Sequence, residues 1–376
     1  MLTMHPVVLH GCTIWDQERL PLDEFTERLR ALTQRMRASG LGGAVIYSDV
    51  RNYAGVCYLT QFIPKHSYAV ALVTADGEIR LLAKLAGTRD VPYVRALSWV
   101  SDIQPVKDLA GQVREFAAQL KERKIGICGK SVMGVSVYNS ITQSCEDAEW
   151  VDWDAELEQL MRQKSYREIS VIRDTCGILR CAVDSMRDIY LRDSSVVTAA
   201  IEAERAARCA GAMDVRVLYS VDAGNTLLPI EGINELRSDP AVVYVAVQYS
   251  GYWADGFVTL SRKRPAGEEA ARTMLLDLLD HMKEGTTVGQ IVQKMQRHEA
   301  TRLLHPAMQD GFGYAIGLSR PEKPCLHASC ADQKLQARTV WSVRIGLRGE
   351  KGGWFASALV AVGREENELL WSSLDI

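Results

Sequence analysis

The stretch from residue 169 to residue 190 carries the apolar pattern that most constrains how this chain can fold. Apolar side chains recur there at steps of three and four residues, which is the period of an α-helix with one buried face. The residues of this stripe are Ile169, Ile172, Cys176, Leu179, Ala182, Met186 and Tyr190. The stripe therefore predicts a long helix that packs one side against the protein core.

The patterns on either side of this helix differ, and together they predict two domains. From residue 20 to 150, short apolar strands alternate with amphipathic helices, which is typical of an α/β domain. After residue 152, long strands separated by pairs of helices indicate an α+β domain with helices packed outside a curved sheet. A chain of 376 residues is also too long for one ordinary core. We place the domains at 1–151 and 152–376.

Composition and charge narrow the kind of partner that the protein can have. Hydrophobic residues make up 47% and charged residues 24%, and the formal net charge is −3. Such a chain has no global field that would draw it onto nucleic acid or an anionic membrane. No window reaches 18 uncharged apolar residues, and the N-terminus lacks the pattern of a signal peptide. We therefore expect a soluble cytoplasmic protein with no nucleic-acid or membrane partner.

Nine cysteines lie at irregular spacings, and the compact group among them is Cys325, His327 and Cys330 in the string CLHASC. A structural zinc site needs about four ligands, usually in two separated pairs, and no second pair accompanies this one. The cysteines are interpreted as free thiols.

Four strings, in chain order, resemble motifs of the creatinase, prolidase and aminopeptidase P family. They are NYAG at 52–55, interpreted as part of a strand, LEQLMRQKSYREISVIRDT at 157–175, GYWADGFVTLS at 251–261 and GFGYAIGL at 311–318. The resemblance covers nearly the whole chain. It implies an α/β N-terminal domain followed by an α+β C-terminal domain of the pita-bread (creatinase/aminopeptidase-like) fold. It also implies a homodimer in which the N-terminal domain of one subunit covers the site of its partner.

The peptidases of this family hold two metal ions with two Asp, one His and two Glu, and most of these residue types are missing here. Asp255 stands at one of the five positions. The others fall on Tyr244, Tyr314, Arg344, and either Ala356 or Ser357. Hard divalent ions need several carboxylate or imidazole ligands. We therefore expect no metal, and the absence of a P-loop or a dinucleotide fingerprint predicts no other cofactor.

The replacements favour a cavity that binds a small anionic organic molecule. Arg344 and Arg320 would place guanidinium groups, which match carboxylate or phosphate, where the family has acidic ligands. An alternative is that Arg344 pairs with Asp255 and fills the metal position with a salt bridge. Tyr314 would act as an acid or base if a nearby arginine lowered its pKa.

Two other segments contribute candidates through the same resemblance. Residues 222–240, where creatinase carries a catalytic His, contain no His and offer Glu231. The string QFIPKHSY at 61–68 follows the NYAG string at a place where related proteins reach a binding site, and a histidine there titrates near neutral pH. The candidate catalytic residues are Asp255, Tyr314, His66 and Glu231. The candidate substrate-binding residues are Arg344, Arg320, Tyr252, Tyr244, Phe62, Lys65 and His327.

Three functions fit these observations. The favoured one is a metal-independent enzyme of creatinase-like fold that acts on a small anionic substrate by acid–base chemistry, through hydrolysis or elimination. The second is a catalytically inactive pseudoenzyme that serves as a binding module. The third is a metallopeptidase with atypical ligands.

Overall fold

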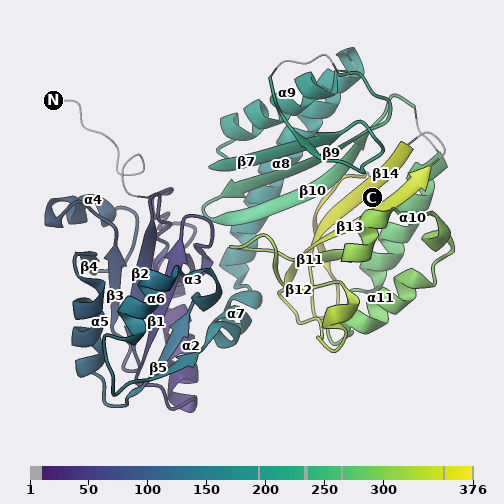
Figure 1. The fold of residues 1–376 in the computed structure, drawn as a ribbon. Helices are drawn as coiled ribbons and strands as arrows, with labels where there is room; N and C mark the ends of the chain where they lie inside the picture. The colour runs from purple at the N-terminus through teal and green to yellow at the C-terminus, as the bar shows by residue number, and fades with distance from the viewer. Residues whose placement is uncertain (1–10, 194, 233–235, 264–265, 350–351, 375–376) are drawn as a thin grey trace, which may run out of the picture. The chain divides into compact units, whose positions relative to one another are not determined.

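The computed structural model describes residues 11–193, 195–232, 236–263, 266–349 and 352–374. The chain divides into two compact units, Met1–Met161 and Arg162–Ile376. Figure 1 draws the first unit in purple and blue and the second in teal, green and yellow. Within the described ranges, no helix combines the length and the apolar character that crossing a membrane requires.

The first unit is built on a six-stranded sheet in the order β4-β3-β2-β1-β5-β6, in which parallel and antiparallel pairs are mixed. Its strands are β1 (Gly43–Asp49), β2 (Tyr68–Thr74), β3 (Ile79–Ala83), β4 (Asp102–Pro105), β5 (Lys124–Cys128) and β6 (Glu149–Asp152). Its helices are α2 (Leu22–Ala38), α3 (Ala54–Thr60), α4 (Val91–Val94), α5 (Leu109–Ala118), α6 (Val135–Thr142) and α7 (Asp154–Arg162). The α/β alternation expected from the sequence is confirmed.

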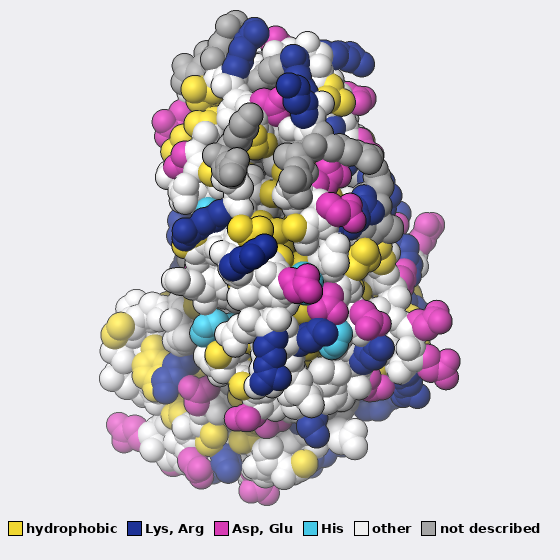
Figure 2. All heavy atoms as spheres, turned by 90° about the vertical axis from the view of Figure 1, so that its right-hand side faces the viewer, with side chains coloured by type: hydrophobic (Ala, Val, Ile, Leu, Met, Phe, Trp, Pro, Cys, Tyr) yellow, Lys and Arg dark blue, Asp and Glu magenta, His cyan; other side chains and the backbone are white. Residues whose placement is uncertain are grey.

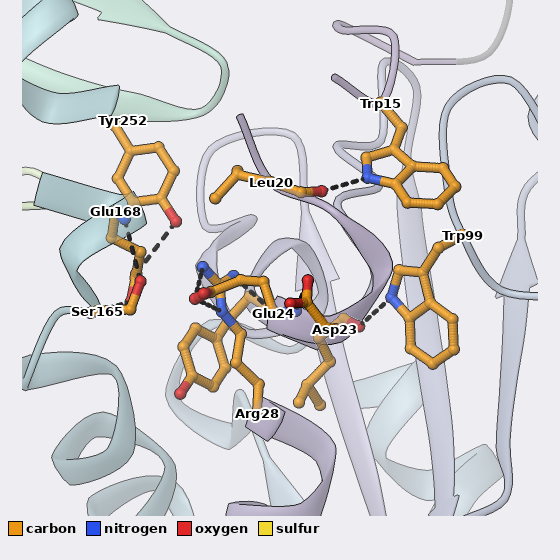
Figure 3. Close-up of polar contacts among 11 residues, drawn as sticks. Trp15, Leu20, Asp23, Glu24, Arg28, Trp99, Ser165, Glu168 and Tyr252 are labelled. Carbon is orange, nitrogen blue, oxygen red and sulfur yellow. Dashed lines mark hydrogen bonds and ion pairs between the residues drawn. The ribbon is translucent and has the colours of Figure 1, made fainter. Parts of the chain in front are cut away.

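Two local features of the first unit follow from polar side chains. Asp49 Oδ1 accepts hydrogen bonds from the backbone N–H groups of Arg51 (2.8 Å) and Asn52 (2.7 Å), which ends β1 in a turn. The chain then enters α3, so the prediction of a strand at the NYAG string is wrong. On α2, the buried Arg28 donates to Glu24 Oε1 at 3.0 Å, and Figure 3 shows this pair.

The second unit contains two sheets in the orders β10-β9-β7-β8 and β12-β11-β13-β14-β15. Their strands are β7 (Asp214–Ser220), β8 (Leu228–Pro229), β9 (Ala241–Tyr249), β10 (Tyr252–Leu260), β11 (Gly313–Ala315), β12 (Glu322–Cys325), β13 (Val340–Gly349), β14 (Gly352–Ala361) and β15 (Glu368–Ser372). The helices are α8 (Tyr166–Asp193), α9 (Val196–Cys209), α10 (Ala266–His281) and α11 (Val288–Gln296). Helices α8 and α9 cover the first sheet, and α10 contacts β13 and β14 (Figure 1).

Helix α8 confirms the helix predicted from the apolar stripe, all seven residues of which are buried. It begins with a reciprocal capping pair, because Ser165 N donates to Glu168 Oε2 (2.9 Å) and Glu168 N donates to Ser165 Oγ (3.0 Å).

Side chains on β10 and β14 join the two sheets. Phe257 N donates to Ser357 Oγ at 2.7 Å, and Phe355 N donates to Thr259 Oγ1 at 2.7 Å. The sheets therefore meet along β10 and β14, and the helices lie on the outside, as the sequence predicted.

Charged side chains of both signs are interspersed on the face of the molecule that Figure 2 shows. This pattern agrees with the near-zero net charge of the sequence.

Candidate functional site

Asp255 lies at the centre of a polar cluster inside the second unit. Its side chain is fully buried on β10, and its register partner on β9 is Ala246. Tyr244 is two residues before Ala246 on β9, so its side chain lies diagonally across from Asp255 on the same face of the sheet. Its hydroxyl donates to Asp255 Oδ2 at 2.5 Å. The hydroxyl of Tyr314 on β11 donates to the same oxygen. Side chains from β9 and β11, which belong to different sheets, therefore meet at the carboxylate of Asp255 on β10.

Arg320 supplies the positive charge of this cluster. Its guanidinium donates to the Tyr244 hydroxyl oxygen, and Nη1 lies 3.9 Å from Asp255 Oδ2. The guanidinium also lies over the ring of Trp253, 5.2 Å from the centroid. Only 15% of the Arg320 side chain is exposed, so the ion pair is shielded from water and from salt.

The segment that carries Arg320 is fixed by a second buried ion pair. Lys164 Nζ lies 2.6 Å from Glu322 Oε2, and the lysine side chain is 1% exposed. A Cβ at Gly317 would lie 2.5 Å from this ammonium nitrogen, so the chain passes close to the lysine at this residue. Trp253 N donates to Gly317 O at 2.8 Å and links the segment to β10. Arg320 is therefore held in place on both sides of its position in the chain.

Tyr252 lies on the opposite face of β10 from Asp255, because side chains alternate along a strand and the two residues are three apart. Its hydroxyl donates to Glu168 Oε1 at 3.0 Å, and Figure 3 shows Tyr252 and Ser165 directed at this carboxylate. Tyr252 therefore anchors the start of α8 and does not line the Asp255 cluster. Trp253 and Phe257 are on the Asp255 face.

Arg344 lies beside the cluster without joining it. Its guanidinium lies over the rings of Tyr314 (5.6 Å) and Phe257 (5.8 Å). Among the residues that the structure describes, its side chain makes no hydrogen bond or ion pair. The alternative prediction of a salt bridge between Arg344 and Asp255 is therefore wrong, because the arginine that pairs with Asp255 is Arg320.

Ser357 is the residue of β14 that stands opposite Arg344 in the β13–β14 register. It is one of the two residues, with Ala356, on which the sequence placed the fifth ligand position. Its hydroxyl accepts from Phe257 N and donates to Phe257 O at 2.9 Å, so both of its hydrogen-bonding functions are used by the backbone.

The remaining candidates lie elsewhere. Glu231 is exposed and follows β8, which is at the far edge of its sheet from β10. His327 precedes a short 3-10 helix, Ala328–Cys330, and lines a separate cavity of about 260 Å³. In the first unit, Phe62 is buried at 2% exposure, Lys65 is half-buried and His66 is exposed.

The protonation of the two tyrosines decides what the cluster can do chemically. Burial, followed by the charge of Asp255, raises the pKa of Tyr244 well above its ordinary value. The same two causes raise the pKa of Tyr314, although Arg344 acts in the opposite direction. Both hydroxyls therefore keep their protons near neutral pH and serve as donors to Asp255. The condition under which Tyr314 would act as an acid or base, a pKa lowered by a nearby arginine, is not met, because burial and the carboxylate outweigh Arg344.

These residues do not fit a pair of divalent ions. Asp255 Oδ2 already accepts two hydroxyl protons, while Oδ1 is buried and accepts no hydrogen bond from the described residues. One free carboxylate oxygen beside a guanidinium cannot replace the water shell of a hard cation. Within the described ranges, no group of three or more His, Cys, Asp or Glu is placed to hold a metal ion.

Sequence reasoning missed the place of Phe257 and the ion pair between Lys164 and Glu322. Phe257 could have been found from its spacing, since it is two residues from Asp255 on a strand and so shares its face. The Lys164–Glu322 pair joins segments 158 residues apart, and no local spacing predicts such a contact.

Comparisons with known proteins agree with the fold. Residues 28–162 match the model of the creatinase/prolidase N-terminal domain, and residues 172–367, more than half of the chain, match the model of metallopeptidase family M24. Comparison with curated protein sequences finds no match.

Solved structures of peptidases have the same architecture. The X-Pro aminopeptidase from Thermotoga maritima matches with a TM-score of 0.74 at 18% identity, covering 91% of this chain and 96% of that one. The prolidase from Pyrococcus horikoshii matches with a TM-score of 0.74 at 14% identity, covering 92% and 97%. Aminopeptidase P from E. coli matches with a TM-score of 0.71 at 15% identity, covering 93% and 94%. The predicted fold, a creatinase-type N-terminal domain followed by a pita-bread domain, is confirmed.

The favoured function from the sequence, a metal-independent enzyme that acts on a small anionic molecule by acid–base chemistry, is contradicted. More than half of the chain matches a metallopeptidase family, and the solved structures named above are peptidases. The expectation gave too much weight to the arginines, of which Arg320 is already engaged with Asp255 and Tyr244.

Proposed function

Because this chain belongs to metallopeptidase family M24, we propose that its second unit is a peptide-binding site that has lost the metal-dependent cleavage step. The observation that carries this proposal is the closed cluster of Asp255, Tyr244, Tyr314 and Arg320. Three of its members, Asp255, Tyr244 and Tyr314, stand at positions where the resemblance to the family places metal ligands. The protein then binds short peptides without hydrolysing them, as a pseudopeptidase.

The cluster has no group that replaces the work of a metal ion in peptide hydrolysis. A catalytic metal polarises the scissile carbonyl and lowers the pKa of a bound water, so that hydroxide forms at neutral pH. Tyr244 and Tyr314 stay protonated and direct their protons to Asp255, and that carboxylate is neutralised by Arg320. Water near this cluster is therefore not activated for attack on an amide.

The surroundings of the cluster favour a short peptide as the ligand. Arg344 is half-buried, lies over Tyr314 and Phe257, and has no partner for its charge among the described residues. A guanidinium of this kind matches the terminal carboxylate of a peptide through two parallel hydrogen bonds. Since the matched structures include an X-Pro aminopeptidase and a prolidase, Xaa-Pro dipeptides are the first ligands to test.

Calorimetry with Gly-Pro, and with Gly-Pro amide as the matched dipeptide that lacks the terminal carboxylate, tests binding. We expect Gly-Pro to bind and its amide to bind more weakly. Arg344→Ala should weaken Gly-Pro binding tenfold or more, since a charge-assisted hydrogen bond is worth about 1.5–3 kcal/mol. Arg364→Ala, which removes an exposed arginine from the loop after β14, is the matched control and should leave binding unchanged.

Chromatography of the same dipeptide after long incubation with the protein and Mn²⁺ tests hydrolysis. The proposal requires that the dipeptide remain intact. Cleavage that disappears on chelation would overturn the loss of peptidase activity. Equal affinity of wild type and Arg344→Ala for Gly-Pro would overturn the assignment of the carboxylate site.

We further propose that the protein works as a homodimer in the cytoplasm. The support for the dimer is the family resemblance of both halves, and the support for a reducing compartment is that all nine cysteines are free thiols. Light scattering on the purified protein should give twice the chain mass, whereas a single chain mass would overturn the dimer.

A further inference from the structure

Two thiols in the CLHASC string lie in contact. Cys325 ends β12 and Cys330 ends the 3-10 helix Ala328–Cys330, and their Sγ atoms are 3.4 Å apart. Both side chains are partly exposed, so an oxidant in solution can reach them. The cluster described above uses neither residue.

We propose that Cys325 and Cys330 form a peroxide-reactive dithiol that closes into a reversible intrachain disulfide. The ligand class of this modification site is a hydroperoxide, and hydrogen peroxide is its simplest member.

The backbone between the two cysteines already brings them together. Cys330 N donates to His327 O at 2.9 Å, and Ser329 N donates to His327 Nδ1 at 3.2 Å, which fixes a tight turn. A disulfide bond measures about 2.0 Å, so the two sulfurs must approach by roughly 1.4 Å. Rotation of the two side chains and a small adjustment of this surface turn supply a movement of that size.

The environments of the two thiols assign them different roles. Burial acts to raise the pKa of Cys330, but hydrogen bonds from Cys325 and Ser329 and the charge of Arg162 outweigh it and lower this pKa. Burial and the contact with Cys330 raise the pKa of Cys325. Cys330 therefore ionises more readily than Cys325, so we assign the attack on the oxidant to Cys330 and the resolution of the product to Cys325.

The reaction balances with one hydroperoxide per disulfide. The Cys330 thiol gives up its proton, and the thiolate attacks one oxygen of hydrogen peroxide. The O–O bond breaks, a sulfenic acid forms at Cys330, and the other oxygen leaves as hydroxide, which takes up the proton that Cys330 released and becomes water. The Cys325 thiol then attacks the sulfenic sulfur, the S–S bond forms, and the sulfenic oxygen leaves as a second water with the proton of Cys325. Two thiols lose two electrons in total, and hydrogen peroxide gains them. A small-molecule dithiol reverses the step by exchange.

Closure of this disulfide acts on the strand that carries Tyr314. Cys325 is the register partner of Tyr314 in the β11–β12 pair. Leu326 N also donates to Gly313 O at 2.7 Å, so the turn and β11 share backbone hydrogen bonds. Oxidation should therefore slow amide hydrogen exchange in a peptide that covers residues 312–330.

Peptide mapping of the full chain after brief exposure to hydrogen peroxide and quenching with an alkylating reagent tests the proposal. We expect a peptide that contains both cysteines, lacks two hydrogens and carries no alkyl group, and that returns to the doubly alkylated form after dithiol treatment. Cys181, an exposed thiol on α8, is the internal control and should remain alkylated. In Cys325→Ser, Cys330 should be trapped as a sulfenic acid by dimedone, and in Cys330→Ser the oxidation of Cys325 should slow at least tenfold.

The wild-type map alone is decisive, whether or not the variants fold. Oxidation of Cys325 and Cys330 no faster than that of Cys181, without an intrapeptide disulfide, would overturn the proposal. Irreversible oxidation of either cysteine to the sulfinic or sulfonic acid would overturn it as well.

Discussion

Replacing Tyr314 by phenylalanine removes one hydroxyl donor from the buried Asp255 carboxylate and keeps the aromatic ring. A hydrogen bond to a charged group contributes about 1.5–3 kcal/mol to stability, and a buried acceptor that loses its donor adds a desolvation penalty. Asp255 keeps the Tyr244 hydroxyl and the Arg320 charge in this variant. We therefore expect Tyr314→Phe to lower the free energy of unfolding of the second unit by about 2 kcal/mol.

The matched control is Thr175→Val. Thr175 is 0% exposed on α8, and its hydroxyl donates to the neutral backbone oxygen of Val171 at 2.8 Å. The loss of a hydrogen bond to a neutral acceptor costs only about 0.5–1.5 kcal/mol. Both substitutions remove one buried hydroxyl and keep the shape of the side chain, so the difference between them reports the effect of the carboxylate.

Hydrogen exchange measured on peptides from β10 and β13 gives the free energy of opening in the second unit itself, without interference from the first. A double-mutant cycle with Asp255→Asn should show a coupling energy of at least about 1 kcal/mol, since the two groups are in contact. If Tyr314→Phe costs no more than Thr175→Val and shows no coupling to Asp255, the reasoning about the cluster is refuted.

Three further predictions concern other parts of the second unit. Lys164→Met leaves Glu322 buried without its cation and should destabilise the unit by about 3–5 kcal/mol in urea denaturation, and adding Glu322→Met should recover part of this loss. Burial and the charge of Arg348 lower the pKa of His305, so its neutral form is favoured in the fold; stability should fall as the pH drops below about 6.5, and His305→Gln should flatten this dependence in thermal melts from pH 7 to 5. Closing the Cys325–Cys330 disulfide constrains a short loop of the unfolded chain and should add about 2 kcal/mol of stability, measured as a higher urea midpoint of the oxidised protein.

The parts of the fold that the sequence predicted are those governed by periodicity. Helix α8 was predicted because apolar residues that recur at helical spacing over more than twenty residues are typical of a helix with one buried face. The strand at the NYAG string was mispredicted because Asp49 forms local hydrogen bonds to the next turn, and apolar content alone does not reveal such a turn.

The centre of the site was also predictable, while its periphery was not. Tyr244, Asp255 and Tyr314 lie together because each occupies a fixed register position on its strand. The choice between Arg320 and Arg344 as the partner of Asp255 depends on how a loop is held by Lys164, which is distant in sequence. The sequence could have predicted that Tyr252 lies on the opposite face of β10 from Asp255, because the two residues are three apart and side chains alternate along a strand.

The central claim is that a tyrosine, aspartate and arginine cluster fills the metal positions of a metallopeptidase fold. The most direct test is the metal content of the purified chain after incubation with Mn²⁺, Co²⁺ or Zn²⁺ and removal of unbound ions, measured by mass spectrometry. A variant that restores the family's ligand types, Tyr244→Asp with Tyr314→His, Arg344→Glu and Ser357→Glu, serves as the positive comparison. We predict well below one ion per wild-type chain and a clear gain in the variant. Two ions per wild-type chain would contradict the account.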